Sequence, residues 1–228
     1  MLRLIALLIL SAGPASAEYV HNNLRMTLYH EVAHAVIDQH DVAQFGPEET
    51  AADTFALVLA DRLHTEADMR ALITDATKMA RSDARSSFFD AWSEYMPADQ
   101  RIAYAICIYY GLNPEMRRST ALALGMPLAS LRSCTDRGAS VRAAWSPLLN
   151  SIAPVAPQSS LKPATVGKAL RLLGRDIDRV NAHIFLPRPI PVSSESCGEE
   201  NAFYFHWDER IVFCTEMVDA LLSQVRGR

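Results

Sequence analysis

The chain has 228 residues, of which 50% are hydrophobic and 21% are charged. This composition is ordinary for a globular protein that is large enough to bury a core. The formal net charge is −4, so we expect no broad electrostatic attraction to nucleic acid or to anionic lipid.

The first residues have the pattern of an export signal. Arg3 supplies a positive start, residues 4–10 are apolar, and residues 15–17 form a small-residue cleavage site, Ala-Ser-Ala. The apolar run is shorter than the about 20 residues that span a bilayer, although an uncleaved membrane anchor is the alternative. We predict a signal peptide at residues 1–17, a single mature domain at 18–228 without stable membrane insertion, and a periplasmic or extracellular location.

The cysteines agree with export. The chain has four, and an even number in an exported chain indicates two disulfides. Of the possible pairings we favour Cys107–Cys134 and Cys197–Cys214, because each pair then lies within one compact segment. A four-cysteine metal site is the alternative, but no two of these cysteines are two to four residues apart.

The hydrophobic pattern predicts a mainly helical α+β protein. Apolar residues recur at four-residue spacing over residues 22–39 and predict a helix: Leu24, Leu28, Val32 and Val36. A second helix follows Gly46-Pro47, and further helices are predicted at about 66–81, 85–95, 99–111, 114–124, 135–150, from 165, and at 215–225. Residues 153–163 are predicted to form a surface linker. Short strands at about 189–194, 201–206 and 210–214 predict a small C-terminal sheet or hairpin, with a turn at 207–209.

The segment HEVAH at residues 30–34 has the spacing of a metal site. His30 and His34 lie four residues apart on a predicted helix, so both imidazoles project from one face and can reach a single Zn²⁺. Glu31 lies about 100° further round the helix. It is therefore predicted to take a proton from a water molecule on the metal.

The next helix offers the third ligand. A catalytic zinc takes three protein ligands and leaves one position open. Glu49 and Asp53 share a helix face, so Glu49 can bind the metal while Asp53 accepts a hydrogen bond from the other nitrogen of a zinc-bound histidine. Two alternatives stay open: Glu48 as the ligand, or two glutamates that merely favour a helix start. The same donor set can also hold non-haem iron.

The combination of HExxH with ExxxD resembles the gluzincin group of zinc peptidases, which implies a zincin-like fold with a two-helix core. The short spacing between the two motifs is more similar to the DUF4344 family, exported bacterial proteins that are classed as metallopeptidases from the same motif. Further segments that fit this family are 99–101, 110–111, 186–189 and 197–204, together with the cysteines and Trp145. The likeness covers nearly the whole mature chain and implies a zinc peptidase with Glu31 as the general base.

A second resemblance concerns substrate binding. Residues 201–204, Asn-Ala-Phe-Tyr, are similar to the edge strand that pairs with an extended peptide in thermolysin-like peptidases, although here the strand follows the metal helices. The likeness implies substrate contacts for Asn201, Ala202 and Tyr204, and strand alternation places His206 on the face of Tyr204. Tyr204, His206 and His183 are the candidates for stabilising an oxyanion. An ordinary disulfide-closed hairpin is the alternative.

The predicted function is therefore zinc-dependent hydrolysis of a peptide or protein substrate outside the cytoplasm. The main alternative is a zinc-containing binding or regulatory protein of the cell envelope that cleaves nothing, because no oxyanion-stabilising residue is identified. A purely structural zinc is a third hypothesis, disfavoured because such sites rely on cysteine. The remaining histidines, His21, His40 and His64, are interpreted as surface residues.

Overall fold

The computed structural model describes residues 14–84, 90–156 and 158–226. Residues 1–13 of the predicted signal peptide lie outside this part of the chain, and cleavage after Ala17 stays a prediction. Residues 14–17 form the start of the first helix. Among the described residues, no helix combines the length and the apolarity needed to cross a bilayer.

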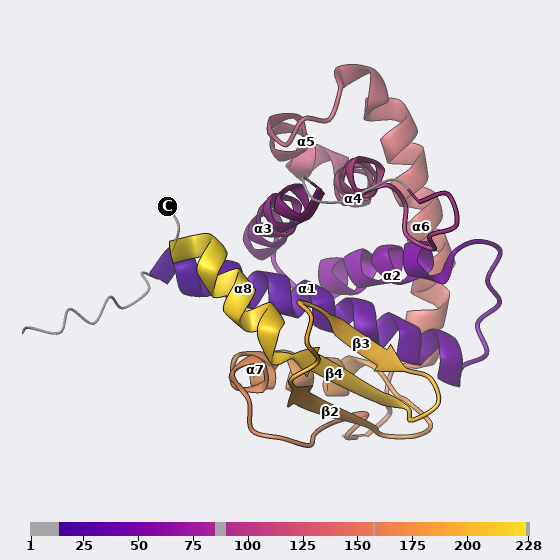
Figure 1. Cartoon of the computed structure of the whole chain (residues 1–228). Coiled ribbons are helices and arrows are strands. Elements are labelled where there is room, and N and C mark those ends of the chain that lie inside the picture. Colours follow the sequence, from indigo (N-terminus) through magenta and orange to yellow (C-terminus); the bar gives the residue numbers. More distant parts are fainter. Residues whose placement is uncertain (1–13, 85–89, 157, 227–228) are drawn as a thin grey trace, which may run out of the picture.

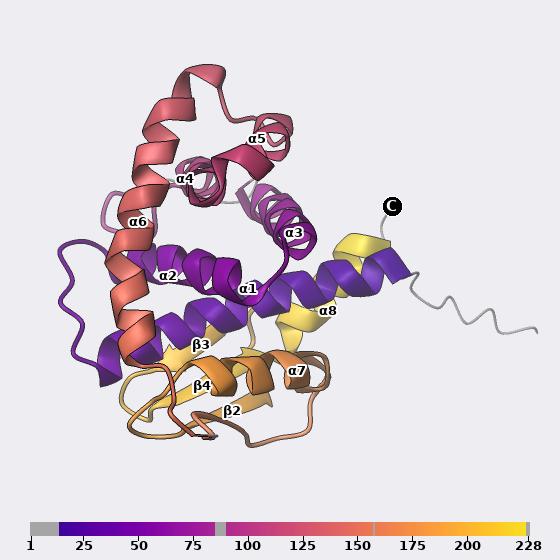
Figure 2. The same ribbon diagram turned by 180° about the vertical axis from the view of Figure 1, so that it is seen from behind.

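The architecture is α+β and mainly helical (Figures 1 and 2). The helices are α1 (Pro14–Gln39), α2 (Glu48–Leu63), α3 (Glu66–Ala84), α4 (Ala98–Leu112), α5 (Pro114–Ala123), a short 3₁₀ helix η1 (Leu128–Ser130), α6 (Leu131–Ser151), α7 (Lys168–His183) and α8 (Thr215–Arg226). The strands are β1 (Leu161–Pro163), β2 (Ile190–Glu195), β3 (Ala202–Phe205) and β4 (Arg210–Cys214).

The four strands form one sheet in the order β1-β2-β4-β3. Strand β2 runs parallel to both β1 and β4, whereas β3 pairs antiparallel with β4, with Tyr204 opposite Ile211. Strand β3 is therefore an edge strand, as the sequence predicts. The predicted turn at 207–209 connects it to β4.

Helix α1 runs through the centre of the molecule, with α2 on one side and the sheet and α7 on the other (Figures 1 and 2). Its predicted apolar stripe is fully buried, with 0% exposure for Leu24, Leu28, Val32 and Val36. The stripe fixes the rotation of α1 about its axis. It therefore decides which of its polar residues face α2.

Helices α4 and α6 cross at a pair of glycines. A Cβ atom added to Gly138 would lie 2.2 Å from the carbonyl carbon of Gly111, so the two backbones are in direct contact. The disulfide Cys107–Cys134 joins the same two helices one turn earlier. The second disulfide is Cys197–Cys214, so both observed pairs are those favoured from the sequence.

Two predicted segments differ from the structure. The prediction of a helix at 85–95 is wrong for residues 90–95, which form turns, while 85–89 lie outside the described residues. The side chains of Asp90 and Ser93 accept hydrogen bonds from the backbone N–H groups of Trp92 and Tyr95, which stabilises turns in place of helix.

The linker predicted at 153–163 is also wrong at its C-terminal end, because residues 161–163 form β1. Leu161 is 1% exposed, and the side-chain amide of Asn181 bonds to both its N–H and its carbonyl. The local sequence does not predict this strand, because its partners are Asn181 and the residues of β2, which are distant in the sequence.

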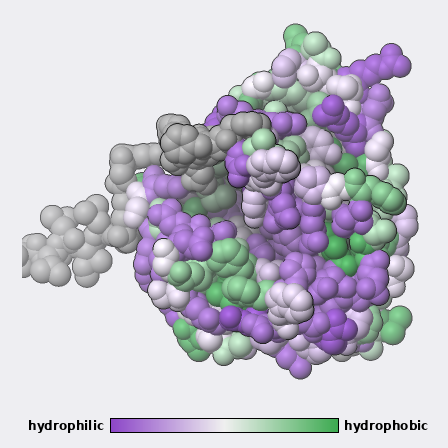
Figure 3. All heavy atoms as spheres, turned by 45° about the vertical axis from the view of Figure 1, so that its right-hand side comes forward, coloured by the Kyte–Doolittle hydropathy of each residue, from purple (hydrophilic) through white to green (hydrophobic). Residues whose placement is uncertain are grey.

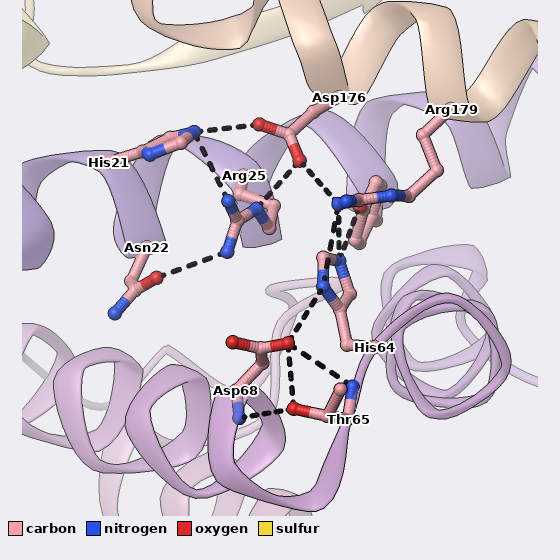
Figure 4. Close-up of polar contacts among 9 residues, drawn as sticks. His21, Asn22, Arg25, His64, Thr65, Asp68, Asp176 and Arg179 are labelled. Atoms are coloured by element: carbon pink, nitrogen blue, oxygen red, sulfur yellow. Dashed lines mark hydrogen bonds and ion pairs between the residues drawn. The ribbon is translucent and has the colours of Figure 1, made fainter.

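A buried ionic cluster joins α1 to α7 and to the residue that follows α2 (Figure 4). The Asp176 carboxylate is fully buried and contacts His21 at 2.7 Å, Arg25 at 2.7 Å and Arg179 at 3.2 Å. Arg179 also approaches His64, which follows the end of α2. We call these five residues the Asp176 cluster.

The interpretation of His64 as a surface residue is wrong. Its side chain is 2% exposed and hydrogen-bonded to the Tyr29 hydroxyl at 2.7 Å.

Candidate metal centre

Helices α1 and α2 pack side by side and bring three potential ligands together. His30 Nε2 lies 3.2 Å from His34 Nε2 and 3.0 Å from Glu49 Oε2, and His34 Nε2 lies 3.6 Å from Glu49 Oε1. One ligand atom from each of these residues lies within 4.8 Å of the other two. The two motifs, which are separate in the sequence, therefore form a single cluster of three potential ligands, which we call the three-donor cluster.

These separations suit a small divalent ion. Tetrahedral ligands at the 2.0–2.1 Å bond lengths typical of zinc lie about 3.3 Å apart. The observed separations of 3.0, 3.2 and 3.6 Å bracket that value. Two imidazoles and one carboxylate are also a donor set that zinc accepts at catalytic sites.

The outer nitrogen of each imidazole is held by a second carboxylate. His30 Nδ1 lies 3.0 Å from Asp53 Oδ1, and His34 Nδ1 lies 2.7 Å from Glu48 Oε1. Such bonds fix which ring nitrogen is protonated and point the other nitrogen inward. Asp53 thus has the contact expected from the sequence, while Glu48 lies behind His34 rather than beside Glu49.

Asp53 is itself anchored by Arg101 of α4, whose Nε and an Nη atom lie 2.6 and 2.7 Å from its two carboxylate oxygens. Burial raises the pKa of Asp53, but the hydrogen bonds from His30 and Arg101 outweigh it and hold the pKa below its usual range. Burial likewise lowers the pKa of His30, whereas Asp53 and Glu49 together raise it to about 10. The carboxylates thus make the site strongly attractive to positive charge.

Glu31 lies beside the three-donor cluster in a buried position. It is 5% exposed, and the backbone N–H of Tyr204 on the edge strand β3 lies close enough to its carboxylate to favour the charged form. Burial raises the pKa of Glu31, and the charges of His30 and His34 oppose that shift. Glu31 is thus a buried carboxylate between the two imidazoles and the edge strand.

Tyr95, which the sequence analysis missed, reaches the centre from the turn before α4. Burial raises the pKa of Tyr95, and the negative charge of Glu49 raises it further, so its hydroxyl lies within the electrostatic reach of this ligand. The Arg101 guanidinium lies 4.9 Å from the centre of the Tyr95 ring. No local pattern marks Tyr95, because the turn that positions it interrupts a predicted helix.

The proposed substrate residues lie in different surroundings. Asn201 lines a cavity next to Glu31, and Ala202 is buried at 5% exposure. The Tyr204 hydroxyl donates to Asp38 at 2.6 Å.

His206 lies in the turn after β3 rather than on the strand, and its ring centre is 4.9 Å from that of Tyr204. Its Nε2 lies 3.8 Å from Glu48, and it forms with His34 and Glu48 a second group of possible ligands. His183 is exposed at the end of α7 and bonds to the backbone oxygen of Arg179, so the structure does not bring it to the metal centre.

A cavity of about 470 Å³ opens directly beside His30 and Glu31. Its walls come from α1, α2, α3, α4 and α8, together with the turns at 90–97 and residues 200–201. Figure 3 shows this side of the molecule, which is hollowed and largely hydrophilic around the hollow. The metal centre is thus continuous with a space that can hold part of a ligand.

The fold and the centre define a mainly helical α+β protein with a two-histidine, one-carboxylate site that can bind a metal ion. The profile of the DUF4344 family, described as "Putative metallopeptidase", matches residues 11–149 and 160–227. The chain therefore belongs to the DUF4344 family. No curated protein and no solved structure gives a significant match.

Proposed function

We propose that this protein is a zinc-dependent peptidase of the zincin-like type, with His30, His34 and Glu49 as the metal ligands. The observation that carries the proposal is the convergence of these three side chains next to the buried carboxylate of Glu31 and an open cavity. A zinc ion bound there supplies Lewis-acid polarisation of a carbonyl group and a lowered pKa for water.

The other steps of the reaction are assigned to residues of the chain. Glu31 accepts a proton from the attacking water and delivers it to the nitrogen of the breaking C–N bond. Asp53 and Glu48 bond to the outer nitrogens of the two imidazoles and so direct the inner nitrogens at the position that the metal would occupy.

Tyr95 is the best-placed side chain to stabilise negative charge on the substrate oxygen. Tyr95 lines the cavity beside the metal centre and senses the charge of Glu49, whereas the Tyr204 hydroxyl is bonded to Asp38 and His183 lies elsewhere. A donor aimed at developing charge contributes roughly 10²–10³ in kcat. Tyr95→Phe should therefore lower kcat by about that factor with little change in KM or zinc content.

The proposal is tested with the purified mature chain loaded with zinc. We expect cleavage of an unstructured protein, inhibited by 1,10-phenanthroline and restored by added zinc. Glu31→Gln should keep its zinc but lose about 10²–10⁴ in turnover, whereas Glu115→Gln, which changes an exposed carboxylate on α5, should match the wild type. Full activity of Glu31→Gln would overturn the proposal.

The alternative of a non-proteolytic binding protein makes a different prediction. It requires that Glu31→Gln and wild type bind one partner equally while neither turns it over. Defined cleavage products from a peptide library with the wild type would rule this alternative out.

Export is part of the proposal and is supported by the two disulfides, which form in oxidising compartments. The intact mass of the protein recovered from the periplasm of an expression host should correspond to a chain that begins at Glu18 with both disulfides formed. Recovery of uncleaved protein in the cytoplasm with free thiols would contradict it.

A further inference from the structure

The cavity beside Glu31 has a polar end and an apolar body. At the metal centre its wall includes the polar side chains of His30, Glu31, Asp53 and Arg101. Away from the centre the wall is formed by apolar side chains of α1, α2, α3 and α8, among which Leu57, Ile73 and Leu221 are at most 4% exposed. The two other charged wall residues, Asp90 and Glu200, are exposed.

Methionine is concentrated on this wall. Of the eight methionines in the chain, four line the cavity: Met26, Met79, Met96 and Met217. Methionine side chains are flexible and polarisable, so they adapt to apolar groups of different shape and are over-used at surfaces that accept several partners. The wall therefore suits a family of apolar groups better than one fixed shape.

Two of the polar side chains on the apolar wall, those of Thr77 and Gln224, already have partners. The Thr77 hydroxyl donates to the backbone oxygens of Ile73 and Thr74, and Gln224 accepts from the Tyr19 hydroxyl. A charged or strongly polar ligand group placed there would lose its hydration without gaining comparable bonds. The cavity volume of about 470 Å³ lies within the usual range of ligand pockets.

We propose that this cavity is the specificity pocket of the enzyme and takes a bulky apolar side chain of a peptide substrate next to the cleaved bond. The inference rests on the proposed peptidase function, because only a substrate held at the metal centre would place its neighbouring side chain there. A peptide is the favoured occupant because the cavity is bordered by Glu31 and by Asn201 at the start of the edge strand. An extended chain can use both.

Two of the alanines that line the pocket are suited to a test of its size. Ala76 on α3 and Ala220 on α8 line the cavity and are half-buried, so a leucine at either position would extend into it. Ala67 lies on the same helix as Ala76 but is exposed. It provides a matched control for the same substitution.

The test measures binding separately from cleavage. Fluorescein-labelled peptides Ser-Gly-Ser-X-Ser-Gly-Ser, with X as Leu, Met, Phe, Ala or Asp, are titrated into zinc-loaded Glu31→Gln and followed by fluorescence anisotropy. Leu, Met and Phe should bind at least about tenfold more tightly than Ala, and within a few-fold of one another. The peptide with Asp should bind most weakly.

The pocket variants are made in the same Glu31→Gln background, and their thermal unfolding is recorded to show that they are folded. Ala76→Leu and Ala220→Leu should reduce the preference for Leu over Ala to within about twofold, whereas Ala67→Leu should leave it unchanged. Absence of binding, binding independent of X, or an unchanged preference in both folded pocket variants would overturn the proposal. Tight binding of laurate, blocked by Ala76→Leu without any dependence on X, would overturn it in favour of an acyl ligand.

The same peptides given to the wild type separate this proposal from the proposed function. Cleavage without preference for apolar X overturns the pocket and leaves the peptidase intact. Binding that depends on X, without cleavage by the wild type, supports the pocket and contradicts the peptidase.

Discussion

Histidines of helix α1 take part in two groups of histidines and carboxylates, one on each of two opposite faces of the helix. His30 and His34 face α2 and the metal centre, whereas His21 and Arg25 face the Asp176 cluster. His21 and His30 are nine residues apart, which is about half a turn beyond two full turns of helix. Both histidines contact a carboxylate at 3.0 Å or less.

The difference lies in the cations. In the Asp176 cluster, two guanidiniums already neutralise the carboxylate, and a guanidinium has no lone pair to offer a metal. At the metal centre the guanidinium of Arg101 binds Asp53, which contacts His30 but is not one of the three potential ligands. The Glu49 carboxylate therefore contacts both imidazoles. Close contact between His and Asp therefore does not mark a metal site; convergence of lone pairs without a competing cation does.

The largest expected effect separates the two groups by activity. His30→Ala removes a ligand and should lower peptide hydrolysis by at least about 10³-fold, because both zinc and its chemistry are lost. His21→Ala should keep hydrolysis within a few-fold of wild type once folded. Initial rates on the same peptide at saturating zinc make the comparison, and equal losses in both variants would contradict it.

The second prediction concerns stability. Asp176→Ala leaves the cationic side chains of Arg25 and Arg179 without their shared buried partner, and breaking a buried pair of this kind costs about 3–5 kcal/mol. Urea unfolding monitored by circular dichroism should show this loss, while the folded variant binds zinc as the wild type does. A loss below about 1 kcal/mol would show that the cluster contributes little to folding.

The third prediction concerns the carboxylates behind the ligands. Asp53→Asn should weaken zinc binding about 10–100-fold, because the His30 imidazole loses its charged acceptor. Competition with a fluorescent zinc chelator measures the affinity. Asp99→Asn, an exposed position at the start of α4, is the control and should have no effect.

The smallest expected effect is a pH dependence of stability that arises from His64. Burial, reinforced by the charges of Arg25 and Arg179, lowers its pKa to about 4. The unfolded chain, in which histidine has a pKa of about 6.5, therefore binds a proton that the folded chain does not. Stability should fall as the pH is lowered from about 6.5 to about 4, and His64→Gln should flatten this part of the profile.

The other groups that face His64 do not change charge in this window. Tyr29 has a raised pKa, and the pKa values of Asp176 and Asp68 are held below their usual range. The comparison is made by thermal unfolding of both proteins between pH 7 and pH 4. If stability falls with pH equally in His64→Gln and in the wild type, the pH dependence arises from groups other than His64.

The parts that could be predicted from the sequence depend on short-range periodicity. The four-residue spacings of the α1 stripe, of His30 with His34 and of Glu49 with Asp53 each describe one face of one helix. A single packing contact between α1 and α2 then places the donors together. The C-terminal strands also followed from local alternation and turn residues.

The parts that could not be predicted depend on distant contacts. Whether Glu48 or Glu49 faces the inner nitrogens of the histidines depends on how α2 is rotated against α1. Two adjacent positions in a sequence do not reveal this rotation. Tyr95 is positioned by a turn that side-chain hydrogen bonds stabilise against helix. The burial of His64 depends on α7, which contributes Arg179 from 115 residues further along the chain.

The most direct test of the account is the zinc content of the purified protein by mass spectrometry after loading and dialysis. We expect about one zinc per chain in the wild type and in His21→Ala, and loss of that zinc in His34→Ala and in Glu49→Gln. A wild type that retains no metal, or a His34→Ala variant that retains as much as the wild type, would contradict the proposed metal centre.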